Sequence, residues 1–93
     1  MKNIQIKLLD TETSIIPYNL LYLADPSVEA VKDYLERGYC YIAMLEEKII
    51  GECVLLPTRN FNIELVNLDV DEPYQNKGYG KQLINHAISI DKN

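Results

Sequence analysis

The spacing of apolar residues alternates along the chain between a period of two and a helical period, and this predicts the order of its elements. Near the N-terminus Ile4, Ile6 and Leu8 alternate with polar residues, which predicts a strand over about residues 3–9. The strongly apolar segment 17–23 follows and predicts a short helix. The chain therefore begins with a strand that leads into helical structure.

Signals at both ends define a second helix. Ser27 follows an Asp-Pro break and is expected to be the N-cap, and Gly38 is expected to end the helix. Between them the apolar residues recur at helical spacing, so they predict one buried face. That face consists of Val28, Val31, Tyr34 and Leu35.

Two further strands are expected over residues 39–45 and 49–56, joined by a turn at two glutamates. If the turn is two residues long, Cys40 falls directly opposite Cys53, and a disulfide between them is sterically conceivable. Reduced, buried thiols in a cytosolic sheet are favoured instead. Neither cysteine has basic neighbours in the sequence that would lower the pKa of its thiol, so nucleophilic catalysis is not predicted.

A change of phase marks the fourth expected strand, residues 61–70. Its apolar residues occupy odd positions up to Leu65 and even positions from Val66 onward, so the period of two slips by one residue. A β-bulge usually accommodates such a slip, and it would leave backbone groups unpaired. A strand buried on both faces would also give an unbroken apolar run, and the two interpretations are compatible.

Two glycines precede the final helix, which is predicted by the spacing of Leu83, Ile84, Ala87 and Ile88. Gly78 and Gly80 allow a tight turn and a close approach of the backbone to a ligand. The free N–H groups of the first helical turn then form a site suited to phosphate, and Lys77 and Lys81 flank it. We therefore expect this loop to hold a pyrophosphate.

The loop does not match two common phosphate motifs. Leu83 stands where a dinucleotide fingerprint needs its third glycine, and Gln82 stands where a P-loop needs serine or threonine. What remains is Q-x-x-G-x-G over Gln75–Gly80, preceded by a strand end and an acidic-Pro-aromatic turn over Asn67–Tyr74. This pattern resembles the acetyl-CoA-binding motif of the GNAT-type N-acetyltransferase superfamily. The alternative is an ordinary strand-to-helix turn whose glycines serve only its geometry.

The resemblance implies a fold. In element order it covers the whole chain and implies a single α/β (α+β) domain over residues 1–93, with three layers: a mixed, mostly antiparallel sheet with helices on both faces. It is specific only from about Glu64 to Ile88. A complete domain of this type continues into a strand parallel to the fourth one, a further helix and usually a hairpin. The chain is therefore expected to be C-terminally truncated, the N-terminal two-thirds of such a domain.

Acetyl-CoA is the cosubstrate that the resemblance implies. In the family the bulged strand opens a V-shaped cleft and pairs with the pantetheine arm, a role that falls here on the backbone of Leu68, Asp69 and Val70. A backbone N–H near Val70 is expected to steady the oxyanion. The pyrophosphate contacts would fall on backbone N–H groups of the loop, formed by Gln75, Asn76, Lys77, Gly78, Tyr79, Gly80 and Lys81.

Glu64 is the expected catalytic base. An ammonium has no lone pair with which to attack a thioester, so a carboxylate whose pKa is raised by burial is suited to take its proton. In some members of the family a glutamate eleven residues before the Gln of the loop acts as the base, and Glu64 has that spacing to Gln75. The alternative is a surface glutamate without chemistry. No residue here corresponds to the family's tyrosine that protonates the departing thiolate.

Composition narrows the choice of partners. The 93 residues are 47% hydrophobic and 25% charged, which is typical of one globular domain. The net charge of −5 argues against nucleic acid and is compatible with a cationic amine or simply with solubility. No apolar run could span a membrane and no signal peptide is recognisable, so a cytoplasmic protein is expected. No metal-ligand spacing occurs, and His86 is expected on the solvated face of the last helix.

The sequence therefore predicts an enzyme, an N-acetyltransferase that moves acetyl from acetyl-CoA to a primary amine of a small molecule or peptide by direct attack. The alternative is a truncated or non-catalytic acyl-CoA-binding module that oligomerises. The edge strand Phe61–Val70 would then be unprotected and would join two copies into a homodimer. Tyr18 and Tyr22 lie in the region that shapes the acceptor pocket in the family, but the sequence does not identify the acceptor.

Overall fold

Strands and helices follow one another along the chain in the predicted order. The computed structural model describes residues 4–12, 15–59 and 62–91. Its elements are β1 (Gln5–Leu8), α1 (Tyr18–Ala24), α2 (Val28–Arg37), β2 (Tyr39–Leu45), β3 (Lys48–Pro57), β4 (Ile63–Val70), the short 3₁₀ helix η1 (Glu72–Tyr74) and α3 (Tyr79–Asp91). No helix within these residues is long and apolar enough to cross a membrane.

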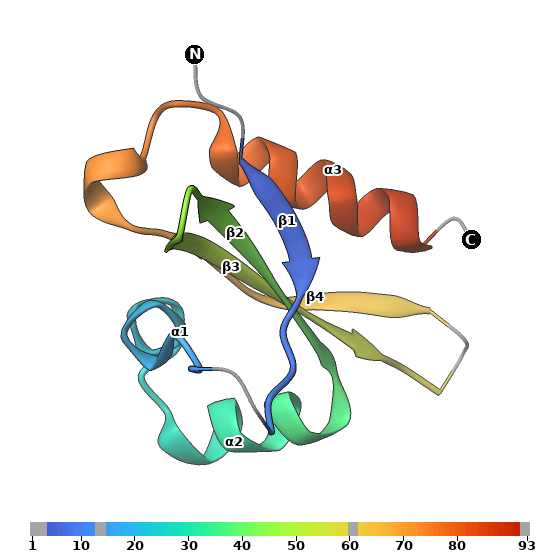
Figure 1. Cartoon of the computed structure of the whole chain (residues 1–93). Coiled ribbons are helices and arrows are strands. Elements are labelled where there is room, and N and C mark those ends of the chain that lie inside the picture. Colours follow the sequence, from blue (N-terminus) through green and yellow to red (C-terminus); the bar gives the residue numbers. More distant parts are fainter. Residues whose placement is uncertain (1–3, 13–14, 60–61, 92–93) are drawn as a thin grey trace.

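The strands form one sheet that is covered by helices on both faces (Figure 1). The strand order is β1-β2-β3-β4, and each neighbouring pair is antiparallel. The helices α1 and α2 lie against one face, and α3 crosses the other. The predicted α+β class with helices on both faces is confirmed. Among the described residues the sheet is purely antiparallel rather than mixed.

Local signals set the bounds of α2. The Ser27 side chain accepts a hydrogen bond from the Ala30 N–H at 3.2 Å, which satisfies one free donor of the first turn. The Gly38 N–H donates to the Tyr34 carbonyl at 2.8 Å and ends the helix. A Cβ at position 38 would lie 2.5 Å from the Leu55 carbonyl oxygen, so glycine also allows α2 to meet β3. Both predicted caps are confirmed.

The strand β1 departs from its predicted alternation at its end. Ile6 is half-buried as expected, but Leu8 is exposed and Leu9 is buried instead. The Leu9 N–H donates to the Cys40 carbonyl at 2.8 Å, which continues the pairing of Leu8 with Tyr41 by one residue. Leu9 therefore points to the opposite face from Leu8, into the core between the sheet and the helices α1 and α2.

An additional residue in β3 changes the register of the β2–β3 pair. The register shifts at Ile50, so Cys40 pairs with Val54, and Cys53 pairs with Tyr41. Adjacent residues of a strand point to opposite faces, so the two cysteines lie on opposite faces of the sheet. Both are free and buried. The prediction of two buried thiols that are not bonded to each other agrees with this geometry, whereas the predicted direct opposition of the cysteines is wrong because of the bulge.

The phase change in β4 is a β-bulge, as predicted. Leu65 and Asn67 pair with consecutive residues of β3, which leaves Val66 as the additional residue. Past the bulge Asn67 faces α1 and α2, whereas Leu68 faces α3. Phe61, the predicted first residue of this strand, lies outside the described residues. The strand is an edge of the described sheet.

Each face of the sheet has its own core. The core under α1 and α2 contains Leu9, Leu21, Val31, Tyr34, Cys40, Ile42 and Val54. The core under α3 contains Ala43, Ile50, Cys53, Val70, Tyr79 and Leu83. Two polar residues, Glu52 and Asn67, are as deeply buried as these apolar ones. Both share the phase of Val54 and therefore lie on the face under α1 and α2.

Candidate active site

The loop before α3 has the backbone conformation that the glycines predict. Asn76 and Gly78 both have positive φ, +62° and +87°, which turns the chain sharply into the helix. The Gly78 carbonyl accepts the Gln82 N–H at 3.1 Å, so the helix begins directly after this glycine. The N–H groups of the first turn then have no intrahelical acceptors and carry the positive end of the helix dipole. This end of α3 is suited to bind phosphate.

Gln75 fixes the loop to the end of β4. Its side-chain Nε2 donates to the Val70 carbonyl at 2.9 Å, and its backbone N–H donates to the Glu72 carbonyl at 3.2 Å. The Gln75 N–H is therefore already satisfied within the turn. The donors left for a phosphate begin after Gln75, nearer to the helix.

The end of β4 and the loop enclose one hollow of about 290 Å³. Most of its lining comes from the residues predicted to contact acetyl-CoA. The hollow is lined by Leu68, Asp69, Val70, Tyr74, Gln75, Asn76 and Gly80. Lys77, Gly78 and Lys81 are exposed outside the lining, and the Tyr79 side chain is buried in the core under α3. The structure thus brings together two groups of residues that the sequence separates by an acidic turn.

The Val70 N–H is engaged within the protein. It donates to Oδ1 of the preceding Asp69 at 2.9 Å. The N–H of Val70 itself is therefore not free in this structure. The expectation of an oxyanion donor near Val70 stays a prediction.

Glu64 lies apart from the hollow. It pairs with Leu56 of β3, it is exposed, and the bulge at Val66 separates it from the residues that line the hollow. Glu64 therefore lies in the expected strand, but its side chain is not enclosed by the protein. Its role as the base stays a prediction.

A buried carboxylate that the sequence analysis missed lies on the neighbouring strand. Glu52 of β3 is 0% exposed, and neither of its carboxylate oxygens has a hydrogen-bond partner among the described residues. Burial, with the nearby charge of Asp69, raises the pKa of Glu52 to about 8. One signal was present: Glu52 is the only charged residue between Ile49 and Leu56.

Neither cysteine is suited to nucleophilic chemistry. Burial, with the charge of Glu52, raises the pKa of both Cys40 and Cys53 to about 12, so both remain thiols at neutral pH. No group of His, Cys, Asp and Glu side chains in the described part of the chain could hold a metal ion.

His86 does not lie on a solvated face. It is half-buried against the sheet, where its ring packs edge-on against Tyr41 with 4.9 Å between the ring centroids, and its Nε2 is buried without a partner. The prediction is wrong because His86 follows Tyr79 and Leu83 on the helix face that covers the sheet. Ile84 and Ile88, predicted to be part of the apolar face, are exposed instead.

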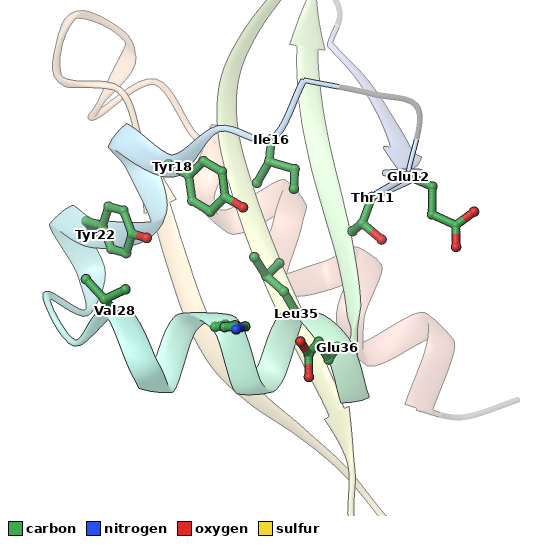
Figure 2. A pocket seen from close by; sticks show the side chains of 9 residues that line it. Thr11, Glu12, Ile16, Tyr18, Tyr22, Val28, Leu35 and Glu36 are labelled. Carbon is green, nitrogen blue, oxygen red and sulfur yellow. The ribbon is translucent and has the colours of Figure 1, made fainter.

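A larger groove of about 580 Å³ lies between the chain after β1 and the helices α1 and α2 (Figure 2). Tyr18 and Tyr22 line it and stack with ring centroids 5.6 Å apart. Lys32 and Glu36 of α2 add charge to its wall. The groove and the hollow beside the loop share no lining residue, so the groove is a separate surface.

Comparison with known proteins gives consistent matches over nearly the whole chain. A model of the "Acetyltransferase (GNAT) family" matches residues 8–93. The uncharacterized N-acetyltransferase YvbK of Bacillus subtilis is 48% identical over 88 residues, which are 95% of this chain and 56% of that protein.

Solved structures agree with this match. A GNAT family acetyltransferase from Elizabethkingia anophelis with acetyl-CoA bound has a TM-score of 0.92 at 42% identity, covering 98% of this chain and 59% of that one. A Bacillus subtilis acetyltransferase in complex with CoA has a TM-score of 0.88 at 47% identity, covering 97% and 59%. The chain thus spans between 56% and 59% of the length of these relatives.

Proposed function

The chain belongs to the acetyltransferase (GNAT) family, and we propose that it transfers an acetyl group from acetyl-CoA to a primary amine. The neutral amine attacks the thioester carbonyl carbon, the C–S bond breaks, and CoA leaves as a thiolate. The chain spans 56% to 59% of the length of its relatives. Acetyl transfer by a protein of the relatives' full length is therefore itself part of the proposal. The acceptor is a small molecule or a peptide that carries the amine.

The hollow beside the loop is the observation that carries the proposal. It joins the end of β4 to the start of α3, where the backbone of Leu68, Asp69 and Val70 would pair with the pantetheine arm. The first turn of α3 would hold the pyrophosphate, with Lys77 and Lys81 beside it. Two related proteins hold acetyl-CoA or CoA in their structures, which supports the choice of cosubstrate.

Glu64 is the base that the spacing to Gln75 favours. Because Glu64 is exposed, it would act on the amine through a water molecule rather than from a dry pocket. A Glu64→Gln variant should then bind acetyl-CoA normally and lose most of its turnover. Unchanged turnover would show that a group other than Glu64 takes the proton from the amine.

Calorimetric titration of the 93-residue chain with acetyl-CoA tests the binding half of the proposal. We expect saturable binding at one site, and its loss in Gly78→Glu, which places a carboxylate beside the pyrophosphate. Asn85→Glu is the matched control, because it adds the same charge at an exposed position farther along α3. No binding by a folded sample, or equal binding by both variants, would contradict the site.

The second candidate function is an acyl-CoA-binding module without turnover that forms a dimer through β4. It is favoured by the exposed apolar side chains beside this edge strand, Leu65, Ile84 and Ile88. Analytical ultracentrifugation of the wild type and of Leu65→Lys tests it, since the charge should disperse the dimer. A wild-type chain that sediments as a monomer removes this candidate.

A further inference from the structure

Oxygen atoms gather without hydrogen-bond donors beneath α1 and α2. Four buried side-chain atoms of the described residues lack a partner, and three of them lie on this face: Oε1 and Oε2 of Glu52, and Oδ1 of Asn67. Glu52 is 0% exposed and Asn67 is 4% exposed. An unpartnered buried acceptor destabilises a fold, so such a group calls for a functional explanation.

The pairing of β3 with β4 brings these groups together with a third. Glu52 directly opposes Asp69, and Asn67 lies two residues before Asp69, so all three side chains belong to the same face. Opposed residues of antiparallel strands have Cβ atoms about 4.5–5.5 Å apart, and diagonal neighbours are within reach of long side chains. The bulge at Val66 sets this arrangement, because without it Asn67 and Asp69 would face α3.

The amide of Asn67 is held in one orientation. Its Nδ2 donates to the Leu21 carbonyl of α1 at 3.1 Å and to the Tyr34 hydroxyl of α2. Both amide N–H groups are thereby used, so Oδ1 remains as an acceptor. The fold therefore fixes the position of this oxygen.

Within the part of the chain that the structure describes, no cation acts on Glu52. The titratable groups that interact with it are Tyr34 from α2, Cys40 from β2, Cys53 from β3 and Asp69 from β4, and none of these is basic. Burial and the charge of Asp69 together raise the pKa of Glu52 to about 8. The unpartnered oxygens of Glu52 and Asn67 are complementary to a primary ammonium, which has three N–H donors and no acceptor.

Asp69 connects this cluster to the cosubstrate. It opposes Glu52 across the strands, and it also lines the hollow together with Leu68 and Val70. Asp69 is only half-buried, in contrast to Glu52. Asp69 is therefore the member of the cluster that borders the hollow, and Glu52 lies across the strand pair from it.

We propose that Glu52, Asn67 and Asp69 receive the acceptor as a primary ammonium and that the Glu52 carboxylate takes its proton. The inference rests on the proposed function and competes with Glu64 for the role of base. One N–H proton moves to Glu52 and later to solvent past Asp69. The freed lone pair forms the C–N bond, the C–S bond breaks, and the second proton lost by nitrogen neutralises the CoA thiolate.

Carbon-13 NMR of the glutamate carboxyl groups of the 93-residue chain tests the site without requiring turnover. The probe is butylamine hydrochloride, with Glu52→Gln used to assign the signal and Glu47→Gln, in the exposed β2–β3 turn, as the matched control. We expect Glu52 to titrate near neutral pH or above, and its midpoint to fall by at least one pH unit in saturating butylamine. A midpoint that butylamine leaves unchanged would overturn the inference.

Acetyl-CoA calorimetry and turnover separate this result from the proposed function. If the chain binds acetyl-CoA but Glu52 does not respond to butylamine, the ammonium site is wrong and the cosubstrate site stands. If Glu52 responds but no amine is acetylated, the ammonium site stands and the transferase proposal fails. Where turnover is present, the acidic limb of kcat/KM should follow the midpoint of Glu52 and disappear in Glu52→Gln, and persistence of that limb overturns the assignment.

Discussion

The two faces of the sheet contribute to the site in different ways. On the face under α3, the chain offers backbone N–H groups at a helix start, preceded by Gly78 with its positive φ. On the face under α1 and α2, it offers side chains: Glu52 and Asn67, with Asp69 at the edge. The first arrangement is local in sequence and has a recognisable motif. The second arrangement depends on strand register and has no recognisable motif.

Burial alone does not explain the difference. Cys40 and Cys53 lie on opposite faces, and burial raises the pKa of both thiols to about 12. A neutral thiol is stable in either core, because it behaves as a small apolar group. Glu52 is different because its ionised form needs donors that the surrounding residues do not provide. Under the two proposals above, the face under α3 would anchor the cosubstrate, and the face under α1 and α2 would take the proton of the amine.

The largest expected effect is a loss of turnover when Glu52, on the face under α1 and α2, is substituted. Glu52→Gln should lower kcat/KM for amine acetylation roughly 100- to 10,000-fold, because it removes a general base. The affinity for acetyl-CoA should stay as in the wild type, since that site is built on the other face. Steady-state kinetics and calorimetry on the same preparations measure both quantities. Full activity in Glu52→Gln would remove this face from the chemistry.

Gly78→Glu should show the opposite pattern, with weaker binding of acetyl-CoA and an unchanged titration of Glu52. A carboxylate beside a pyrophosphate costs several kcal/mol, which weakens acetyl-CoA binding by at least about 100-fold. Gly78→Ala is the control for the positive φ of +87°, because it introduces the backbone strain without the charge. The titration of Glu52 should be unchanged in both variants. A shift of the Glu52 midpoint would mean that the faces are coupled.

Stability should depend on pH through Glu52. Its pKa is raised from 4.5 to about 8, so the folded chain keeps a proton that the unfolded chain has lost. The free energy of unfolding should therefore be highest below pH 4.5 as far as this group is concerned, and fall as pH rises to about 8. The loss should be on the order of a few kcal/mol.

Urea unfolding at about pH 5.5 and about pH 8.5 measures this loss, and Glu52→Gln should flatten the difference between the two. Glu47→Gln, which changes an exposed glutamate, should leave the wild-type difference in unfolding free energy between the two pH values intact. An equal difference in the wild type and in Glu52→Gln would show that Glu52 does not titrate in this range.

The smallest expected effect compares one buried polar side chain from each face. Asn67→Leu should lower the free energy of unfolding by about 1–3 kcal/mol, because the Leu21 carbonyl and the Tyr34 hydroxyl lose their partner. His86→Phe should change it by less than about 1 kcal/mol, since it removes an unpartnered nitrogen and keeps the packing on Tyr41. Urea denaturation ranks the two, and the reverse order would show that the hydrogen bonds of Asn67 stabilise the fold less than the ring of His86 does.

Local patterns predicted much of this fold. The caps Ser27 and Gly38 and the bulge at Val66 follow from residue types and spacing within a few positions. The loop that ends at Gly78 belongs to the same class, because a positive φ and a helix start are properties of a short segment. These features were readable because the physics that determines them acts over a few neighbouring residues.

The remainder required the three-dimensional structure. The sequence by itself determined the element order, the α+β class, the loop suited to phosphate and the Gln75–Gly80 motif that resembles the family's. Only the tertiary structure decided which carboxylates are buried. Glu64 is exposed and Glu52 is enclosed, because burial depends on which strand is central, which face a bulge assigns, and which helix covers it. Desolvation, and therefore the pKa of a carboxylate, is set by atoms that are distant in sequence.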